Sequence, residues 1–341
     1  MTLAPAPATE SDRWQAWDRF LEATPETGFM QSSWWAEFRA ASGYRCFGVT
    51  LKERGGLVGG AMVMKWTYAP GQCFYYIPDG PVLPAVESDA GRAFDAILGA
   101  LERHRAAEAQ TVSHLRIEPR WTRLPGFLSG FEALDTPDAY AEPRETLCID
   151  LRPSLEEILA QMKPKGRYNI HLARRHGVTV SEDRSARGLA DFVRIHADTA
   201  RRREIDAKSP GYFGRLLSLL SLRRQIGIFF AEYQGRRLAT ALVVHFGRRA
   251  TYFYGGSLDE DRHLMAPYLL QFEILRHAKA KGCECYDLWG VAPEERPPGS
   301  WRGISVFKRK FGGREQRLLP TLDRVYERAA YAGYRAAAAV V

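Results

Sequence analysis

Cysteine is scarce in this 341-residue sequence, and long apolar runs are absent. The five cysteines are odd in number and scattered, which favours reduced thiols over a disulfide framework. Cys283 and Cys285 form a C-x-C pair, but no second pair follows at zinc-ligand spacing, so we predict no metal site. No run approaches the roughly 18 apolar residues of a membrane span, and residues 1–10 lack the features of a signal peptide. These absences predict a cytoplasmic protein.

The motifs of several common enzyme classes are also missing. The sequence contains no G-x-S-x-G, no H-E-x-x-H and no G-x-x-x-x-G-K-[ST]. The eight histidines are dispersed, and none lies beside a serine or cysteine in a pattern that suggests a triad. Hydrolases and nucleoside triphosphatases therefore have no support in the sequence.

Charge is distributed unevenly along the chain. Lysine and arginine number 48 against 40 acids, a formal net charge of +8. Residues 1–150 hold 14 basic and 20 acidic residues, whereas residues 151–341 hold 34 basic and 20 acidic residues. The second half, at net +14, is expected to contact a polyanionic partner.

Hydrophobic periodicity and turn signals predict two units with the same order of elements. The first half is expected to form helices at 11–23, 32–41 and 91–107 and strands at 46–51, 57–68, 73–77 and 112–117. The second half is expected to form strands at 226–233, 238–246 and 250–255, a helix at 265–281 and a strand at 283–288. Three antiparallel strands, a helix and a further strand thus occur twice, which indicates an α+β fold.

The region between and after these units is mixed. We expect a strand near 146–150, a helix capped by Ser154, a basic segment at 163–176, a strand at 178–182 and helices at 187–202 and 210–220. The segment 300–311, a short strand and a helix from about 322 to 339 close the chain.

Each repeated unit resembles half of a GNAT-type N-acyltransferase fold. In that fold a glycine-rich turn before the helix presents backbone N–H groups to the pyrophosphate of coenzyme A. The corresponding residues here are 78–81 and 257–261, and neither segment matches that turn. Because the second segment carries three acids, coenzyme A is an unlikely acyl donor and no cofactor is expected.

Four groups of motifs, taken in order over some 280 residues, resemble the FemABX family of peptidoglycan aminoacyltransferases. They are residues 31–39 with 76–82, residues 163–170 with 173–178, residues 252–257, and residues 289–291 with 303–313. The resemblance implies two tandem GNAT-like domains without a long coiled-coil arm. Domain 1 is expected at 11–148, completed by 318–341, and domain 2 at 149–317, after a disordered tail at 1–10.

The resemblance also implies a reaction, in which an aminoacyl group leaves its tRNA ester and is joined to an amine of a stem peptide. The family's catalytic pair maps to Phe307 and Lys308, with Lys308 stabilising the developing oxyanion. Spacing alone favours a surface lysine beside Arg309 and Lys310, and the resemblance reverses this preference.

The acceptor of this family is a muramyl-peptide precursor, linked to a nucleotide or a lipid. The residues that match its contacts are Arg39, Lys208, Tyr212 and Tyr254. Family members often carry lysine at the first position and arginine at the second, so the two cations are exchanged here and their hydrogen-bond geometry differs. A lipid-linked acceptor implies peripheral membrane association, although the sequence shows no dedicated amphipathic helix for it.

Basic residues in the second half are expected to contact aminoacyl-tRNA and precursor phosphates. Acids are missing from residues 162–181, so no partner within that segment neutralises its cations. The predicted phosphate-binding residues are Lys163, Lys165, Arg167, Arg174, Arg175, Arg302 and Lys310.

Two alternatives remain open. One keeps the fold but uses an acyl thioester as the donor, with another cell-surface polymer as acceptor. The other is a noncatalytic protein of the same fold that binds RNA or a glycan. Retention of Phe307 and Lys308 weighs weakly against the second alternative, because a basic surface does not require that phenylalanine.

Overall fold

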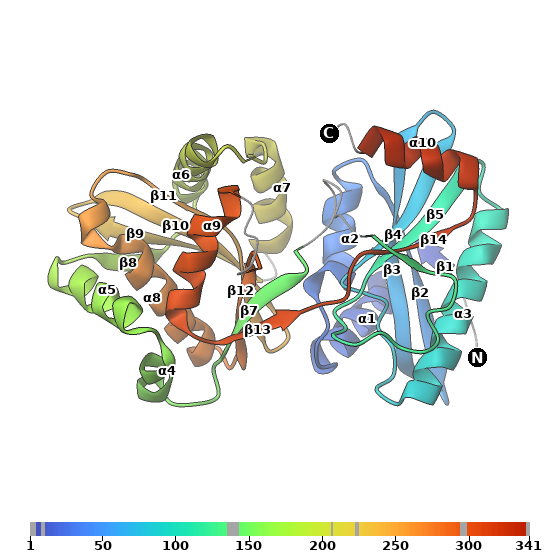
Figure 1. The fold of residues 1–341 in the computed structure, drawn as a ribbon, viewed down its shortest axis with the longest axis horizontal. Coiled ribbons are helices and arrows are strands. Elements are labelled where there is room, and N and C mark those ends of the chain that lie inside the picture. Colours follow the sequence, from blue (N-terminus) through green and yellow to red (C-terminus); the bar gives the residue numbers. More distant parts are fainter. Residues whose placement is uncertain are drawn as a thin grey trace. The chain divides into compact units, whose positions relative to one another are not determined.

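The computed structural model describes residues 5–7, 11–134, 143–205, 207–221, 225–293 and 299–338. The chain divides into two compact units: unit 1 comprises Met1–Arg144 with Leu318–Val341, and unit 2 comprises Glu145–Arg317. Within the described residues, each unit holds one seven-stranded mixed sheet flanked by helices (Figure 1). The predicted α+β class is confirmed.

The sheet of unit 1 has the order β1-β2-β3-β4-β5-β14-β6. Its strands are β1 (Pro5–Pro7), β2 (Arg45–Glu53), β3 (Gly56–Ala69), β4 (Gln72–Pro78), β5 (Thr111–Glu118), β6 (Glu132–Ala133) and β14 (Leu322–Val325). Only β4 and β5 pair in parallel among these described strands. The crossover between them is the long helix α3, as a parallel pair requires.

The helices of unit 1 cover this sheet. They are α1 (Ser11–Ala23), the single turn η1 (Phe29–Gln31), α2 (Ser33–Ala40), α3 (Glu87–Ala106) and α10 (Arg328–Ala338). Helix α3 buries Ala93, Phe94, Ile97 and Leu101, whose spacing places them on one face against the strands.

Gln31 explains why two of the sequence motifs lie together. Its amide nitrogen donates to the carbonyl oxygens of Met62 (3.2 Å) and Pro78 (2.5 Å), and its amide oxygen accepts from Met62 N at 2.8 Å. Its own carbonyl accepts from Trp17 Nε1 at 2.8 Å. The motif at 31–39 therefore joins β3 and the end of β4, and its first residue has a structural role.

The C-terminal segment differs from the sequence prediction. The helix expected from residue 322 begins at Arg328, because Leu322–Val325 forms β14 between β5 and β6. Strand β14 places Asp323 where Arg116 binds it through two hydrogen bonds of 2.8 Å, with both side chains almost fully buried. The tail also differs, since Pro5–Pro7 pairs with β2 instead of remaining unstructured; residues 1–4 and 8–10 lie outside the described residues.

The sheet of unit 2 has the order β13-β7-β12-β11-β10-β9-β8. Its strands are β7 (Glu145–Asp150), β8 (Thr179–Glu182), β9 (Ile226–Tyr233), β10 (Arg236–Phe246), β11 (Arg249–Ser257), β12 (Cys285–Gly290) and β13 (Arg314–Arg317). Within this sheet β11 and β12 pair in parallel, and the crossover between them is α8. The order of elements seen in unit 1 thus recurs.

The helices of unit 2 include the predicted basic segment. They are α4 (Leu155–Gln161), α5 (Pro164–Arg175), α6 (Ala186–Arg203), α7 (Pro210–Ser221), η2 (Arg262–Leu264), α8 (Ala266–Ala280), α9 (Gly299–Lys308) and η3 (Arg309–Phe311). The predicted cap at Ser154 is confirmed, because its hydroxyl accepts from Glu157 N while the Glu157 carboxylate accepts from Ser154 N. None of the helices described in the structure combines the length and apolar character that a membrane crossing needs.

Candidate active site

Lys308, the last residue of α9, is buried and 5% exposed. Its Nζ donates a hydrogen bond of 2.7 Å to the carbonyl oxygen of Gly290 and lies 5.7 Å from the ring centroid of Tyr252. Burial lowers the pKa of Lys308 from 10.5 to about 7, and the negative charge of Asp287 opposes this shift. Both the ammonium and the neutral amine are therefore populated near neutral pH.

Asp287 on β12 supplies the anion that acts on Lys308, although no motif in the sequence points to it. Its carboxylate is fully buried, accepts hydrogen bonds from Trp289 N (2.9 Å) and the Thr146 hydroxyl, and pairs with Arg249 Nη1 at 3.0 Å. A buried carboxylate is tolerated when such donors satisfy it. An aspartate inside an apolar strand was the available signal.

The backbone after β12 is held by α9 and η3. Ser305 Oγ accepts from Ala292 N at 2.8 Å, and Arg309 Nη2 donates to Ala292 O at 2.7 Å. The Arg309 guanidinium also binds both carboxylate oxygens of Glu315, at 2.6 and 2.9 Å. Together with the hydrogen bond from Lys308 to Gly290, these contacts fix the loop that contains Gly290 and Ala292.

Phe307 packs between helices. Its ring lies 5.0 Å from that of Tyr268 on α8 and 5.2 Å from that of Phe311 on η3, measured between centroids. These contacts anchor the end of α9 next to the buried lysine.

Two of the predicted acceptor residues in unit 2 meet directly. The phenolic oxygens of Tyr212 on α7 and Tyr254 on β11 lie 3.1 Å apart. Lys208 is exposed and precedes Pro210, the first residue of α7, so it lies outside the helix that carries Tyr212. Ser209 instead caps this turn, and its hydroxyl accepts from Tyr212 N at 3.2 Å.

His196 on α6 supports the same tyrosine pair and was also missed. It is 7% exposed, its Nδ1 lies 3.1 Å from the carbonyl oxygen of Gly255, and its ring meets the Tyr254 ring edge-on at 5.7 Å. Burial lowers the pKa of His196, and the hydrogen bond to Gly255 opposes that shift. A lone histidine in an amphipathic helix gave no sequence signal.

Arg39 belongs to α2 of unit 1. Its guanidinium carbon lies 4.0 Å from the ring centroid of Tyr44 and 5.8 Å from that of Trp66. Its Nε is buried and has no hydrogen-bond partner among the described residues. Stacking on two aromatic rings holds the cation in place.

Helix α5 is docked against the segment that follows Lys308. Lys163 N donates to the carbonyl oxygen of Lys310 at 3.1 Å, and a Cβ added at Gly166 would lie 2.4 Å from the same oxygen. The glycine therefore permits the contact between α5 and η3. Lys310 itself is half-buried, and Arg302 on α9 is exposed.

The predicted phosphate-binding residues of α5 divide into two groups. Lys163, which immediately precedes α5, Lys165 and Arg175 are exposed and form no ion pair within the described residues. Arg167 donates to backbone carbonyls at the end of α4, and Arg174 pairs with a carboxylate on α8 at 2.8 Å. Counting acids only within residues 162–181 therefore overestimates the unpaired positive charge of this segment, because Glu273 of α8 pairs with Arg174.

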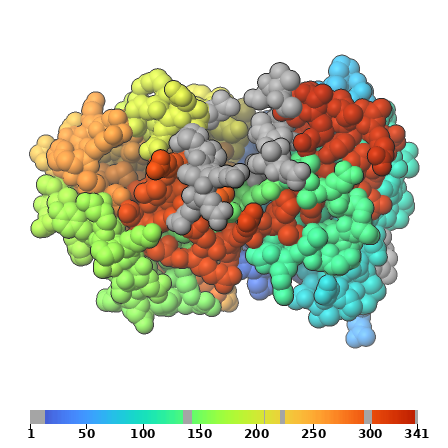
Figure 2. All heavy atoms as spheres, in the orientation of Figure 1, coloured from blue at the N-terminus to red at the C-terminus, as the bar shows by residue number. Residues whose placement is uncertain are grey.

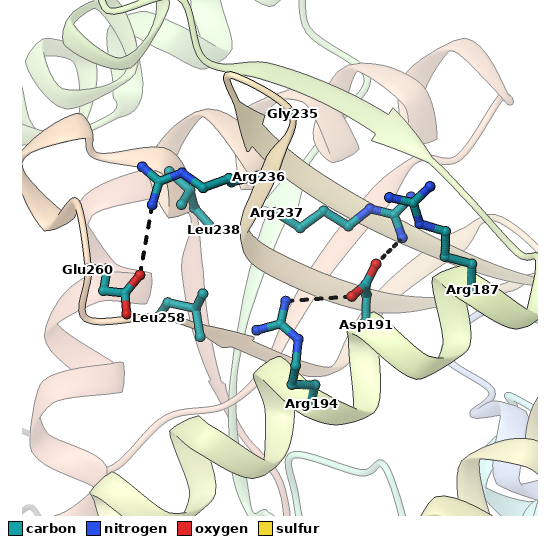
Figure 3. A pocket seen from close by; sticks show the side chains of 9 residues that line it. All are labelled: Arg187, Asp191, Arg194, Gly235, Arg236, Arg237, Leu238, Leu258 and Glu260. Carbon is teal, nitrogen blue, oxygen red and sulfur yellow. Dashed lines mark hydrogen bonds and ion pairs between the residues drawn. The ribbon is translucent and has the colours of Figure 1, made fainter.

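A pocket of about 240 Å³ lies between α6 and the start of β10 (Figure 3). Arg237 points at Asp191 (3.1 Å), which also pairs with Arg194 (3.5 Å), while Arg236 faces Glu260 at 3.8 Å across the pocket (Figure 3). Acids therefore pair with three of the four arginines that line the pocket, and within the described residues Arg187 forms no ion pair. Glu260 belongs to the acidic segment at 257–261, where a coenzyme A pyrophosphate was expected not to fit.

Sequence relatives cover almost the whole chain. The model of the FemAB family matches residues 14–124, 128–232 and 221–339. A UDP-N-acetylmuramoylpentapeptide-lysine N(6)-alanyltransferase of Weissella viridescens is 25% identical over 334 residues, covering 93% of this chain and 95% of that protein. A lipid II:glycine glycyltransferase of Staphylococcus aureus (strain MRSA252) is 20% identical, covering 87% of this chain and 88% of that protein.

Solved structures establish the fold. The crystal structure of FemX superposes with a TM-score of 0.85 at 18% identity, covering 97% of this chain and 99% of that one. A tandem GNAT protein from the clavulanic acid biosynthesis pathway superposes with a TM-score of 0.54 at 12% identity, covering 96% and 99%. The tandem GNAT-like fold expected from the sequence is confirmed.

Proposed function

The chain belongs to the FemAB family, and from this premise we propose that it is an aminoacyltransferase that adds an amino acid to the stem peptide of a peptidoglycan precursor. The observation that carries the proposal is the match to an alanyltransferase of muramoylpentapeptides along 93% of this chain. Aminoacyl-tRNA is the proposed donor, which places the reaction in the cytoplasm. The proposed acceptor is a muramyl peptide linked to a nucleotide or a lipid.

The proposed reaction exchanges an ester for an amide. The acceptor amine attacks the ester carbonyl, a C–N bond forms, and the C–O bond to the tRNA ribose breaks. The amine loses a proton and the departing ribose oxygen gains one. Because the ester is already activated, positioning and stabilisation of the tetrahedral oxyanion are what the protein must supply.

Lys308 is the proposed donor to that oxyanion. Its ammonium is desolvated, so a hydrogen bond from it to a developing negative charge is stronger than the same bond in water. The carbonyl of Gly290 fixes the direction of the amine, and the loop contacts from Ser305 and Arg309 fix that carbonyl's segment. Phe307 positions the lysine through its packing against α8 and η3.

Arg39, Lys208, Tyr212 and Tyr254 are the proposed acceptor-binding residues. The hydrogen-bonded tyrosine pair presents two phenolic groups, and Lys208 is an exposed ammonium on the segment that enters α7. Arg39 presents a stacked guanidinium in unit 1. Phosphates and carboxylates of a muramyl-peptide precursor are the groups such cations and phenols recognise.

The proposal is tested with purified protein, charged tRNA and a panel of muramyl-peptide acceptors, with products identified by mass spectrometry. An amide product that requires intact tRNA and disappears after ribonuclease treatment supports it. Product formed from an acyl thioester without tRNA identifies the thioester alternative instead. RNA or glycan binding without product from any donor identifies the noncatalytic alternative.

Lys308→Met tests the assigned role within the same assay. We expect turnover to fall by at least a hundredfold with little change in acceptor affinity, because the lost interaction is made in the transition state. Lys52→Met, which removes an exposed lysine of β2, is the matched control and is expected to retain full activity. Equal activity of the two variants would remove Lys308 from the mechanism.

A further inference from the structure

The outward side of α5 carries a stripe of exposed residues that packing does not explain. Lys165, Tyr168, His171 and Arg175, here called the α5 stripe, follow a spacing of three, three and four residues and therefore share one side of the helix. All four side chains are exposed, and Tyr168 is 50% exposed. Figure 2 shows the surface of this segment in light green at the left of the view.

The opposite side of α5 accounts for its docking. Gly166, Asn169, Ile170 and Ala173 are buried, facing α8 and η3. Tyr168 takes no part in this packing and leaves half of its large side chain in water. Its ring instead lies 5.3 Å from the ammonium of Lys165, measured to the centroid. An aromatic ring beside a cation, on a helix face that carries a second exposed cation in Arg175, suits a ligand with both flat rings and negative charges.

We propose that the α5 stripe binds single-stranded RNA, with the Tyr168 ring stacking on an unpaired base and the neighbouring cations contacting phosphates. This inference rests on the proposed tRNA donor and names the part of it that is recognised. Proteins that bind single strands combine aromatic platforms with basic side chains, because every base has a flat face and every nucleotide has a phosphate.

The chemistry of the stripe favours a single strand over other polyanions. The stacked bases of a duplex are closed to an aromatic side chain, so a duplex would use the cations and not the ring. A membrane-binding face would need several apolar side chains along one stripe, and this one has a single aromatic residue.

The position of α5 also fits this assignment. Its first turn contacts Lys310, two residues beyond Lys308, and its 12 residues span roughly 18 Å at the helical rise. The stripe is therefore carried by the helix that contacts the segment following Lys308, within the same unit. An aminoacyl ester is carried on the single-stranded 3′ end of tRNA, so that end is the segment the stripe would hold.

The test compares a short single-stranded RNA with a blunt duplex of the same sequence, using fluorescence anisotropy at fixed salt. Tyr168→Ala is expected to weaken binding of the single strand about tenfold and to leave the duplex unchanged. Tyr168→Phe keeps the ring and is expected to bind as the wild type does. Leu124→Ala, which truncates an exposed apolar residue in unit 1, is the control.

Salt dependence tests the cations of the stripe. Lys165→Ala and Arg175→Ala are each expected to reduce the slope of log affinity against log salt by about 0.7 for the single strand. Arg92→Ala, which removes an exposed cation of α3, is the matched control for the loss of one charge.

Three results overturn the inference. In the first, Tyr168→Ala binds the single strand as the wild type does. In the second, it loses affinity equally for the single strand and the duplex. In the third, Tyr168→Ala loses affinity only for vesicles of anionic lipid. Its failure is separable from failure of the proposed function. If the wild type transfers an amino acid from tRNA and Tyr168→Ala does so with unchanged KM for tRNA, the stripe is wrong and the enzyme assignment stands. If transfer never occurs but the ring-dependent RNA binding persists, the enzyme assignment is wrong and the stripe stands.

Discussion

The buried position of Lys308 predicts a pH-dependent stability that does not depend on any substrate. In the unfolded chain its pKa is the ordinary 10.5, whereas burial lowers it to about 7 in the folded protein. The folded state therefore binds fewer protons than the unfolded state between these two values. Stability contributed by this group must rise with pH across that window, because the slope has the sign of protons bound unfolded minus folded.

The magnitude follows from the shift. A difference of about 3.5 pKa units at roughly 1.36 kcal/mol each corresponds to a penalty of about 5 kcal/mol, fully present only at pH values well below 7. Between pH 7 and pH 9 about 2 kcal/mol of this penalty is relieved. Lys308→Met removes the titrating group and keeps an unbranched apolar side chain of similar length. The variant also loses the hydrogen bond to Gly290, worth about 1 kcal/mol, but that loss does not vary with pH.

The assay is urea denaturation of wild type and Lys308→Met at half-unit intervals from pH 7 to pH 9. We expect the wild type to gain about 2 kcal/mol in the free energy of unfolding relative to the variant across this range. Lys310→Met, which removes a half-buried lysine two residues further on, controls for the loss of one charge. Parallel curves for wild type and Lys308→Met would refute the reasoning, because they would mean that the amine titrates alike in both states.

Further predictions concern two glycines and an acid of unit 2. Gly166→Ala places a methyl group 2.4 Å from a backbone carbonyl of η3 and should cost about 1–3 kcal/mol in urea denaturation. In Gly303→Ala the added methyl group lies 2.7 Å from the end of a flexible arginine side chain, which can move away, so we expect a loss of less than about 1 kcal/mol in the free energy of unfolding. A larger loss of stability than for Gly166→Ala would contradict this expectation. Hydrogen bonds from Ser185 and Arg237 lower the pKa of Asp183 from 3.8 to about 2, so its stabilisation is present above pH 4 and lost as the pH falls towards 2. Asp183→Asn should flatten that part of the acid unfolding curve, and an unchanged curve would argue against it.

Local signals were sufficient for most of the fold. Several features act within a few residues, so the local sequence predicts them. They are the cap at Ser154, Pro164 in the first turn of α5 and the glycine turns between strands. The end of the chain was misread because β14 exists through its partners. Asp323 forms a buried ion pair with Arg116, 207 residues away, and this outweighs the helical pattern of the neighbouring residues.

The sequence predicts the candidate site only in part, again because several of its side chains depend on partners far away in the sequence. The motif resemblance points to Lys308, but the environment of its amine comes from residues far away in the sequence. The amine donates to the carbonyl oxygen of Gly290, 18 residues away, and the charge of Asp287 on β12 acts on it. His196 contacts Gly255 across 59 residues, and nothing within its own helix marks it. Side chains whose role comes from a distant partner have no local pattern, whereas the hydrogen-bonded pair of Tyr212 and Tyr254 was found because a family motif names each member.

The net charge of the second half takes a different meaning once its partners are known. Arg249, Arg309 and Arg237 bind carboxylates of unit 2, so these cations hold the fold together and offer little to a polyanion. The surface available to the proposed RNA is set by the cations that remain exposed, such as Lys165 and Arg175, of which Lys165 lies beside the ring of Tyr168. Net charge alone therefore predicts only a class of partner, whereas pairing inside the unit decides which cations remain available on the surface. It follows that removing a paired arginine should chiefly lower stability, while removing an exposed cation of the stripe should chiefly change the salt dependence of RNA binding.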